Sequence, residues 1–324
     1  MSNKKYHVVA LGELLIDFTE DNLSIQGNPL YEANPGGAPC NVLSMLNNLG
    51  KKTSFIGKVG NDQFGIYLKE TLDELGIGNE NLVFDNEVNT TLAFVKTLDN
   101  GDRDFSFYRN PGADMMLRSD EINEELLKST EVFHFGTLSM THINARKATK
   151  KALDIAIEND AIISFDPNLR EHLWESLEDA KKQVLYGLGK CHILKIADNE
   201  IKWLTGEDDF TRAVNKICEH FDIPLILVSM GREGSRAYYN EIMIEAPAFL
   251  QENTIETTGA GDTFCACIIN YILENGLQDL SPEQLEEMLT FANAAASIIT
   301  TRKGALRVMP TKLEVYELIK KSQS

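Results

Sequence analysis

The sequence predicts an α/β fold, with a doubly wound, mostly parallel sheet, helices on both faces and a small β lid. Short β-rich segments alternate with longer segments whose apolar residues recur at helical spacing, over residues 6–76 and again from residue 131. A hairpin signal between these two series predicts the separate small sheet. The 324 residues are 43% hydrophobic and include no linker-like segment, which predicts one domain over residues 1–324.

The chain begins with a β-rich run over residues 6–11, and the sequence GELLIDF over residues 12–18 continues it. Asp17 is an isolated acid near the end of this run, and such an acid is usually just solvated. A second strand and a second helix follow over residues 53–76. A strand, a helix, a strand and a helix in this order are the start of a parallel sheet.

Gly36 and Gly37 lie directly before the first helix. Pro39 suits the first turn of a helix because its missing N–H is not needed there, and Gly50 ends the helical pattern. Two glycines before a helix allow a ligand to approach the backbone closely, or they form a simple turn.

Residues 91–98 and 104–108 are β-type runs joined by Asp-Asn-Gly-Asp. Asn-Gly between two such runs is a strong hairpin signal. A hairpin inserted into a βα series predicts a small sheet that covers a site. Arg109 and Asp114 follow in a loop with Pro and Gly.

In the second series, the ends of three predicted strands carry polar or small residues. Ligands of open α/β sheets bind beyond the carboxyl ends of the strands. This rule singles out Asp166, Asn168 and Arg170, then residues 195–200, then residues 229–234. Each stretch is also compatible with an ordinary surface loop. The strands are expected over residues 132–135, 162–165, 193–196 and 225–229, and the helices over residues 142–159, 176–188 and 209–221.

The C-terminal third adds β structure and two capped helices. Asn240 is a turn residue between two short strands over residues 237–246. Later helices begin with capping boxes, at Ser281 and at Thr311. The segment FANAAASII over residues 291–299 is rich in small residues, which permits close packing or the approach of a flat ligand.

Residues 256–264, Glu-Thr-Thr-Gly-Ala-Gly-Asp-Thr-Phe, form a glycine loop that opens an apolar helix. Backbone N–H groups and the positive end of a helix favour an anion at such a loop. Asp262 would repel that anion, so it makes most sense as a base that takes a proton from an attacking hydroxyl. The alternative is a helix N-terminus with Asp in its first turn. A Walker A loop is absent.

The composition limits partners and compartment. A net charge of −18 argues against a nucleic-acid or anionic-membrane surface. No apolar run is long enough for a membrane span, and the N-terminus lacks a signal-peptide core, so we expect a cytoplasmic protein. The five cysteines are widely spaced and fit free thiols in a reducing compartment.

With the motifs at residues 36–41 and 258–262 at the two ends of one α/β chain, the sequence resembles the ribokinase family of carbohydrate kinases. The run GKVGNDQFG over residues 57–65 also matches. The resemblance covers nearly the whole chain. It implies a lid made from about residues 15–34 and 89–114, and a reaction that transfers the γ-phosphoryl group of ATP to a sugar hydroxymethyl group with Mg²⁺. It also implies a homodimer.

The resemblance assigns roles to particular residues. Asp262 would be the base, and Gly259, Ala260 and Gly261 the anion hole. The sugar site would include Asp17, Gly36, Gly37, Asn41, Tyr108, Arg109, Asn168 and Arg170. The resemblance, together with the rule that ligands bind beyond the carboxyl ends of the strands, predicts a nucleotide site at Lys195, Ser229, Gly231, Gly234, Thr258 and Asn293.

Three segments resemble fructokinases most closely: GGAPCN over residues 36–41, FYRNPGADMML over residues 107–117, and DPNLREHLW over residues 166–174. Kinases of 2-keto-3-deoxygluconate share the Tyr-Arg and Asp-Pro-Asn-x-Arg elements and are the runner-up. The carboxylate of that sugar would need a cation, which Arg109 or Arg170 could supply.

Two positions depart from the family pattern. Ala197 replaces the Asn of an Asn-x-x-Glu motif, so only Glu200 is retained, near the expected Mg²⁺ and phosphates. Glu256 stands where the family usually has Asp, so dependence on potassium cannot be assumed. A non-catalytic sugar or nucleotide sensor on this fold is the alternative of another class. A sensor would be expected to have a damaged base or anion hole, and both motifs are intact here.

Overall fold

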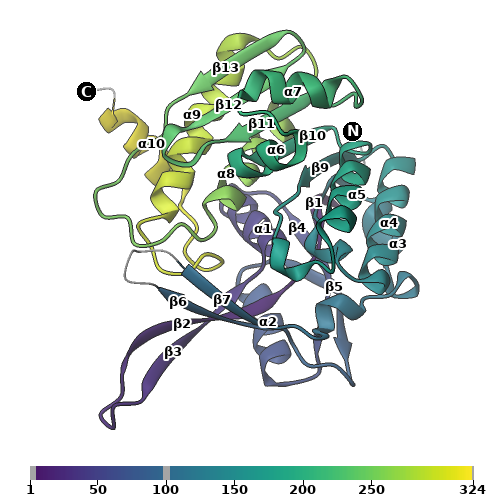
Figure 1. Ribbon diagram of the computed structural model, residues 1–324, viewed down its shortest axis with the longest axis vertical. Coiled ribbons are helices and arrows are strands. Elements are labelled where there is room, and N and C mark those ends of the chain that lie inside the picture. Colours follow the sequence, from purple (N-terminus) through teal and green to yellow (C-terminus); the bar gives the residue numbers. More distant parts are fainter. Residues whose placement is uncertain (1–4, 98–102, 323–324) are drawn as a thin grey trace.

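The computed structural model describes residues 5–97 and 103–322. Its large sheet has the strand order β13-β12-β11-β10-β9-β8-β1-β4-β5 (Figure 1). Neighbouring strands pair in parallel except β11 with β12 and β12 with β13, which pair antiparallel. The strands are β1 Tyr6–Leu11, β4 Thr53–Gly60, β5 Gly78–Asp85, β8 Thr130–Gly136, β9 Ile162–Asp166, β10 Ile193–Ala197, β11 Leu225–Ser229, β12 Ser235–Tyr239 and β13 Ile242–Ala246.

Helices cover both faces of this sheet, because its strands carry apolar residues on both sides. In β1, Val8 and Ala10 belong to one buried cluster, and Val9 and Leu11 belong to the other. The first cluster lies under α1 Ala38–Asn48, α2 Gln63–Glu74, α8 Ala260–Asn275, α9 Pro282–Ile299 and α10 Lys312–Ser322. The second lies under α3 Glu124–Lys128, α4 Ile143–Glu158, α5 Leu177–Leu188, α6 Asp198–Thr205 and α7 Phe210–Cys218. The doubly wound α/β fold is therefore confirmed.

A second sheet of four strands projects from the large sheet (Figure 1). Its order is β3-β2-β6-β7, with β2 and β6 parallel and the other pairs antiparallel. The strands are β2 Leu15–Leu23, β3 Pro29–Gly36, β6 Leu92–Thr97 and β7 Arg103–Tyr108. They fall largely within the two segments expected to form the lid. The predicted Asn-Gly turn lies outside the described residues.

The structure corrects three expectations of the sequence analysis. Residues 12–18 do not continue the first strand, because the chain leaves the large sheet after Leu11 and enters the second sheet at Leu15. Strand β5 was not predicted, although it pairs with β4 along its length. Part of the segment 195–200 is the first turn of α6 and not a loop.

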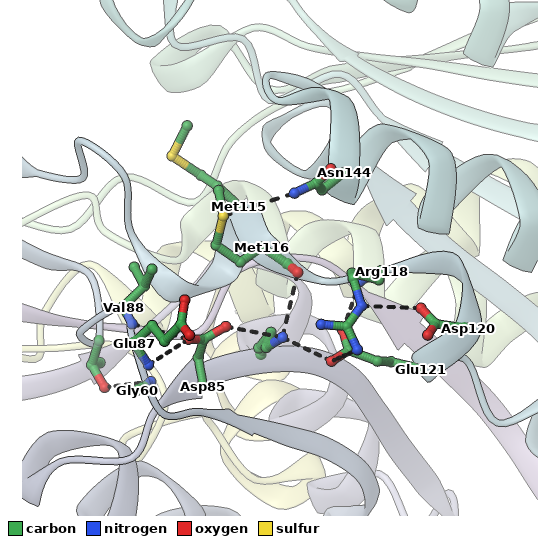
Figure 2. A network of polar contacts seen from close by, with 12 residues as sticks. Gly60, Asp85, Glu87, Val88, Met115, Met116, Arg118, Asp120, Glu121 and Asn144 are labelled. Atoms are coloured by element: carbon green, nitrogen blue, oxygen red, sulfur yellow. Dashed lines mark hydrogen bonds and ion pairs between the residues drawn. The ribbon is translucent and has the colours of Figure 1, made fainter.

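A network of charges around the buried Lys58 fixes the segment that follows the second sheet (Figure 2). Lys58 Nζ on β4 lies 3.0 Å from Asp85 Oδ2 and 2.8 Å from Glu121 Oε1, and it donates to the Met116 carbonyl at 3.4 Å. Burial alone would raise the pKa of Asp85. Hydrogen bonds from the N–H groups of residues 87 and 88 and from Lys58 outweigh this effect, so the pKa is lowered. The charges satisfy one another, which indicates a structural role.

Candidate active site

The loop before α8 is shaped for an anion. Gly259 has a φ of 76° and is the N-cap of α8, and a Cβ there would lie 2.8 Å from the Ala305 Cβ, so the position needs glycine. Among the described residues, no side chain caps this helix terminus. The positive end of α8 is therefore available to a negatively charged group beside Ala260 and Gly261.

Asp262 lies in the first turn of α8 and joins the two ends of the chain. Its Oδ2 accepts a hydrogen bond from Asn41 Nδ2 of α1 at 2.8 Å. Burial raises the pKa of Asp262 to about 6, and repulsion from Asp166 adds to this, while Asn41, Lys195 and Arg170 oppose it. A carboxylate with such a pKa is ionised at neutral pH and can accept a proton from a hydroxyl.

The residues around the start of α1 are packed against the loop after β1. Gly37 has a φ of 131°, and a Cβ there would lie 2.4 Å from the Glu13 carbonyl oxygen. A Cβ on Gly36 would lie 2.5 Å from Asp17 Oδ2. The buried Oδ1 of Asn41 has no hydrogen-bond partner within residues 5–97 and 103–322. Asp17 thus lies beside Gly36, and Asn41 follows Gly37 by one helical turn and reaches Asp262.

Glu13 is a site residue that sequence reasoning missed. Its side chain is buried, and its Oε1 accepts the Ala38 N–H at 2.9 Å. Burial raises the pKa of Glu13 to about 7. The only signal in the sequence is an acid directly after Gly12 at the end of a β-rich run, which on its own does not distinguish a buried carboxyl from a solvated one.

A second group of charges lies behind the α8 loop. Lys195 Nζ on β10 is 2.9 Å from Asp166 Oδ2 on β9, and both side chains are buried. A Cβ on Gly261 would lie 3.1 Å from Lys195 Nζ, so this ammonium group is next to the loop. Burial lowers the pKa of Lys195, but Asp166 and Glu200 raise it by more. Lys195 therefore supplies a fixed positive charge at the candidate anion hole.

Glu200 caps α6 and leaves neither carboxylate oxygen without a partner. Its Oε1 accepts the Leu169 N–H at 2.6 Å, and its Oε2 accepts the Ala197 N–H at 2.8 Å. Burial raises the pKa of Glu200, and Lys195 opposes that effect. Within the described part of the chain, no group of three or more His, Cys, Asp or Glu residues could hold a metal ion.

The residues expected to hold the sugar from the lid side differ in their surroundings. Arg109 is buried, and its Nε and Nη2 donate to Asp114 Oδ2 at 2.8 and 2.6 Å. It also donates to the Leu138 carbonyl and to Thr141 Oγ1, both at 3.1 Å. Most of its donors are thus already used inside the protein. Tyr108 is 66% exposed at the end of β7.

The two residues expected at the sugar from the segment after β9, Asn168 and Arg170, flank Leu169 in the sequence. Asn168 has a φ of 45°, and its N–H donates to Asp166 Oδ1 at 3.2 Å. Arg170 is exposed, but its charge lowers the pKa of Asp262. Both therefore lie on the Asp166 and Asp262 side of the molecule.

A cavity of about 270 Å³ lies beside the α8 loop. Four of the residues expected at the nucleotide line it, whereas Lys195 and Thr258 do not. Asn293 of α9 accepts from Ser235 Oγ at 2.9 Å and donates to the carbonyls of Ala246 and Pro247 at 3.0 and 3.1 Å. It therefore fixes the wall of the cavity. The lining includes Ser229, Gly231, Gly234, Phe249, Leu250, Thr257, Ala260, Gly261, Phe264, Asn293 and Ala296.

None of the helices in the described residues is long and apolar enough to span a bilayer.

Known carbohydrate kinases resemble this chain in sequence. The model of the pfkB family of carbohydrate kinases matches residues 5–312. Fructokinase-1 of Zea mays is 39% identical over 317 residues, which cover 97% of this chain and 98% of that protein. Fructokinase-2 of Solanum lycopersicum is 38% identical over 315 residues, covering 97% and 96%.

Solved structures are similar over nearly the whole chain. The Xylella fastidiosa fructokinase with bound ATP has a TM-score of 0.90 at 28% identity, covering 98% of this chain and 99% of that one. The Vibrio cholerae fructokinase with fructose, ADP and calcium bound has a TM-score of 0.85 at 26% identity, covering 97% and 99%. The chain therefore belongs to the pfkB family of carbohydrate kinases.

Proposed function

We propose that this chain is an ATP-dependent fructokinase, which transfers the γ-phosphoryl group of ATP to a hydroxymethyl group of fructose. The observation that carries the proposal is the 2.8 Å hydrogen bond between Asn41 and Asp262. It joins the start of α1, where a sugar would bind, to the anion-binding end of α8. The fructokinase relatives, and the solved fructokinases with ATP or with fructose and ADP, support this choice.

In the proposed reaction, Asp262 accepts the proton of the attacking sugar hydroxyl. Phosphoryl transfer has a loose transition state, so positioning and charge stabilisation supply most of the rate. Asn41 holds Asp262, and with Asp17 and the backbone of Gly36 and Gly37 it would hold the sugar hydroxyls. The side chains of Tyr108, Asn168 and Arg170 would complete the sugar site.

Negative charge on the moving phosphoryl group would be stabilised by the start of α8, over residues 259–261, and by Lys195. Both are positive and are held in place before ATP binds, so little reorganisation is needed during the reaction. The cavity lined by Ser229 and Asn293 would hold the nucleoside part of ATP. Thr258 lies just before the loop and would contact the phosphates.

Mg²⁺ would bind with ATP, because it is commonly held by substrate phosphates, water and only one or two carboxylates. When bound, it would neutralise charge on the phosphates. Glu200 would face the ion through water, since both of its oxygens already accept backbone N–H groups. We do not include potassium in the proposal, because Glu256 Oε1 already accepts the Gly304 N–H at 2.9 Å.

The test is ATP-dependent phosphorylation of fructose, 2-keto-3-deoxygluconate, ribose and adenosine, each measured as kcat/KM. We expect fructose to be the best acceptor. A higher value for 2-keto-3-deoxygluconate would move the assignment to the kinase of that acid sugar. Arg170 would then be its exposed cation, since Arg109 is paired with Asp114. No product from any acceptor would favour a sensor.

We also propose a homodimer in the cytoplasm, with the second sheet as both lid and contact surface. Large apolar side chains of this sheet and its hairpin are exposed, including Leu23, Leu30, Tyr31 and Tyr108. Such a face suits a second copy of the chain. Light scattering at working concentration checks the proposal, and a monomeric mass would contradict it.

A further inference from the structure

Glu13 supplies the cap that the first turn of α1 lacks. The N-cap residue of α1 is Gly37, which has no side chain to accept an N–H, and Pro39 in the first turn has no N–H to donate. The Ala38 N–H instead donates to Glu13 Oε1 at 2.9 Å, across 25 residues of sequence. An acceptor oxygen at this position satisfies an N–H group that has no partner within the helix.

The loop that carries Glu13 and the start of α1 fit together closely. A Cβ on Gly12 would lie 2.5 Å from Pro39 Cγ, and a Cβ on Gly37 would lie 2.4 Å from the Glu13 carbonyl oxygen. The backbone after β1 therefore touches the backbone before α1, and the Glu13 side chain then holds the first N–H of that helix. Movement of α1 relative to this loop would break the contact.

Asn41 lies one turn further along α1, and its side chain donates to Asp262 at 2.8 Å. Its N–H closes the first helical hydrogen bond, to the Gly37 carbonyl at 3.0 Å. The position of the Asn41 amide therefore depends on the first turn that Glu13 caps. Since this hydrogen bond lowers the pKa of Asp262, the ionisation of Asp262 reports on the placement of Asn41.

We infer that Glu13 is a positioning residue, which holds the first turn of α1 so that Asn41 meets the proposed base Asp262. The inference rests on the proposed function only in naming Asp262 as the base. Glu13 acts through its hydrogen-bond acceptor and not through its charge, since either protonation state of a carboxyl keeps an acceptor oxygen. A glutamine keeps that acceptor, and an alanine removes it.

Other charged and titratable groups near Glu13 and Asp262 could also change the pKa values of these two carboxyls. Asp166 on β9, Lys195 on β10 and Arg170 act on Asp262 besides Asn41. Asp114 and Arg109 act on Glu13, and His134 lines the same small cavity as Glu13. Glu13 holds the first turn of α1, and Asn41 of that helix donates to Asp262. A shift in the titration of Asp262 in Glu13 variants therefore points to Asn41 as the intermediary.

The experiment compares Glu13→Ala, Glu13→Gln and Asn41→Ala by the pH dependence of kcat with fructose and ATP. In Glu13→Ala we expect kcat/KM for fructose to fall about 10-fold, and the acidic limb to move up by about half a pH unit or more. Glu13→Gln should retain the wild-type limb. Glu13→Ala should add no further shift in the Asn41→Ala background, because the contact it supports is already gone.

Two controls separate this role from general loss of structure and from failure of the proposed function. Asp209→Ala removes the N-cap of α7, remote from the site, and should leave the limb in place. NMR of protein labelled with ¹³C at aspartate carboxyls follows the Asp262 titration without substrate, with Asp262→Asn identifying the signal. An unmoved Asp262 titration in folded Glu13→Ala, or a shift in Glu13→Gln equal to that in Glu13→Ala, would overturn the inference. Lack of fructose turnover by the wild type, with the NMR shift present, would instead overturn only the proposed function.

Discussion

At the α1 end of the site, buried polar side chains make hydrogen bonds that join separate segments of the chain. The cavity beside α9 is instead lined largely by small and apolar residues. At the α1 end, Asn41 holds Asp262 and Glu13 holds Ala38. At the α9 end, the Asn293 side chain donates to the Ala246 carbonyl in the cavity wall, and the cavity has a volume of about 270 Å³. The first region suits recognition by placed hydrogen bonds, and the second suits recognition by shape.

The largest expected effect is that of Asp262→Asn. We expect kcat to fall by about 10² to 10⁴, the usual range for a general base, while fructose still binds. In the wild type, kcat should fall as the pH drops through about 6, because Asp262 is then protonated. Steady-state kinetics with a coupled ADP assay measures both. A kcat of Asp262→Asn within about 3-fold of the wild-type value would contradict the role of Asp262 as the base.

The next largest effect comes from a substitution that disturbs the α1 end without removing a polar side chain. Gly37→Ala forces a side chain into a φ of 131° and against the Glu13 carbonyl, so the first turn of α1 must shift. We expect the KM for fructose to rise about 10-fold to 100-fold. Gly50→Ala is the matched control at the other end of α1, since its φ is 80° and no atom lies within 4 Å of a Cβ there. Equal changes of KM in both variants would contradict the special role of the first turn.

The α9 end should respond to volume. Ala296 lines the cavity and is only partly buried, so Ala296→Leu would fill part of the space proposed for the nucleoside. The KM for ATP should rise about 10-fold with the KM for fructose unchanged. Measuring each KM at a saturating concentration of the other substrate tests this. An increase confined to fructose would reverse the assignment of the two ends.

The smallest expected effect is on stability. It concerns His134, a buried titrating group that takes no part in the proposed reaction. Burial lowers the pKa of His134 from 6.5 to about 3, with repulsion from Lys195 in the same direction. The unfolded chain therefore takes up this proton at higher pH than the folded one. Stability from His134 is complete above pH 6.5 and is lost as the pH falls toward 3.

His134→Gln tests this relation by urea unfolding at several pH values. Its free energy of unfolding should decline less steeply than that of the wild type between about pH 6.5 and pH 4. The comparison must be a difference between the two proteins, because the raised pKa values of Glu13 and Asp262 stabilise the folded state as the pH falls. Parallel curves would show that His134 titrates alike in both states.

Much of the architecture follows from local patterns, and the exceptions have physical causes. Helical spacing and the glycine loop predict the alternation of elements and the placement of Asp262 at the start of α8. The break after Leu11 could not be predicted, because the pairing of Leu15 with Gly36 depends on a partner strand far along the chain. Strand β5 was missed for a similar reason, since its pairing with β4 decides it.

Motifs in the sequence point to part of the candidate site, whereas burial, which the sequence does not reveal, decides the surroundings of the rest. Asn41 and Asp262 belong to separate motifs, and the fold brings them to 2.8 Å. Arg109 was expected at the sugar, but the nearby Asp114 binds it in a buried ion pair. Glu13 was not expected, because nothing in the sequence indicates that its carboxyl is buried against the start of a helix.

In the proposed reaction, a sugar hydroxyl and the γ-phosphoryl group of ATP meet at Asp262, and closure of the lid would keep water away from the phosphoryl group. ³¹P NMR of wild-type protein with fructose, ATP and Mg²⁺ tests it most directly, because sugar phosphate and inorganic phosphate give separate signals. The account predicts that the fructose phosphate ester and ADP accumulate together with little inorganic phosphate. Inorganic phosphate as the main product, at the same rate with and without fructose, would contradict it.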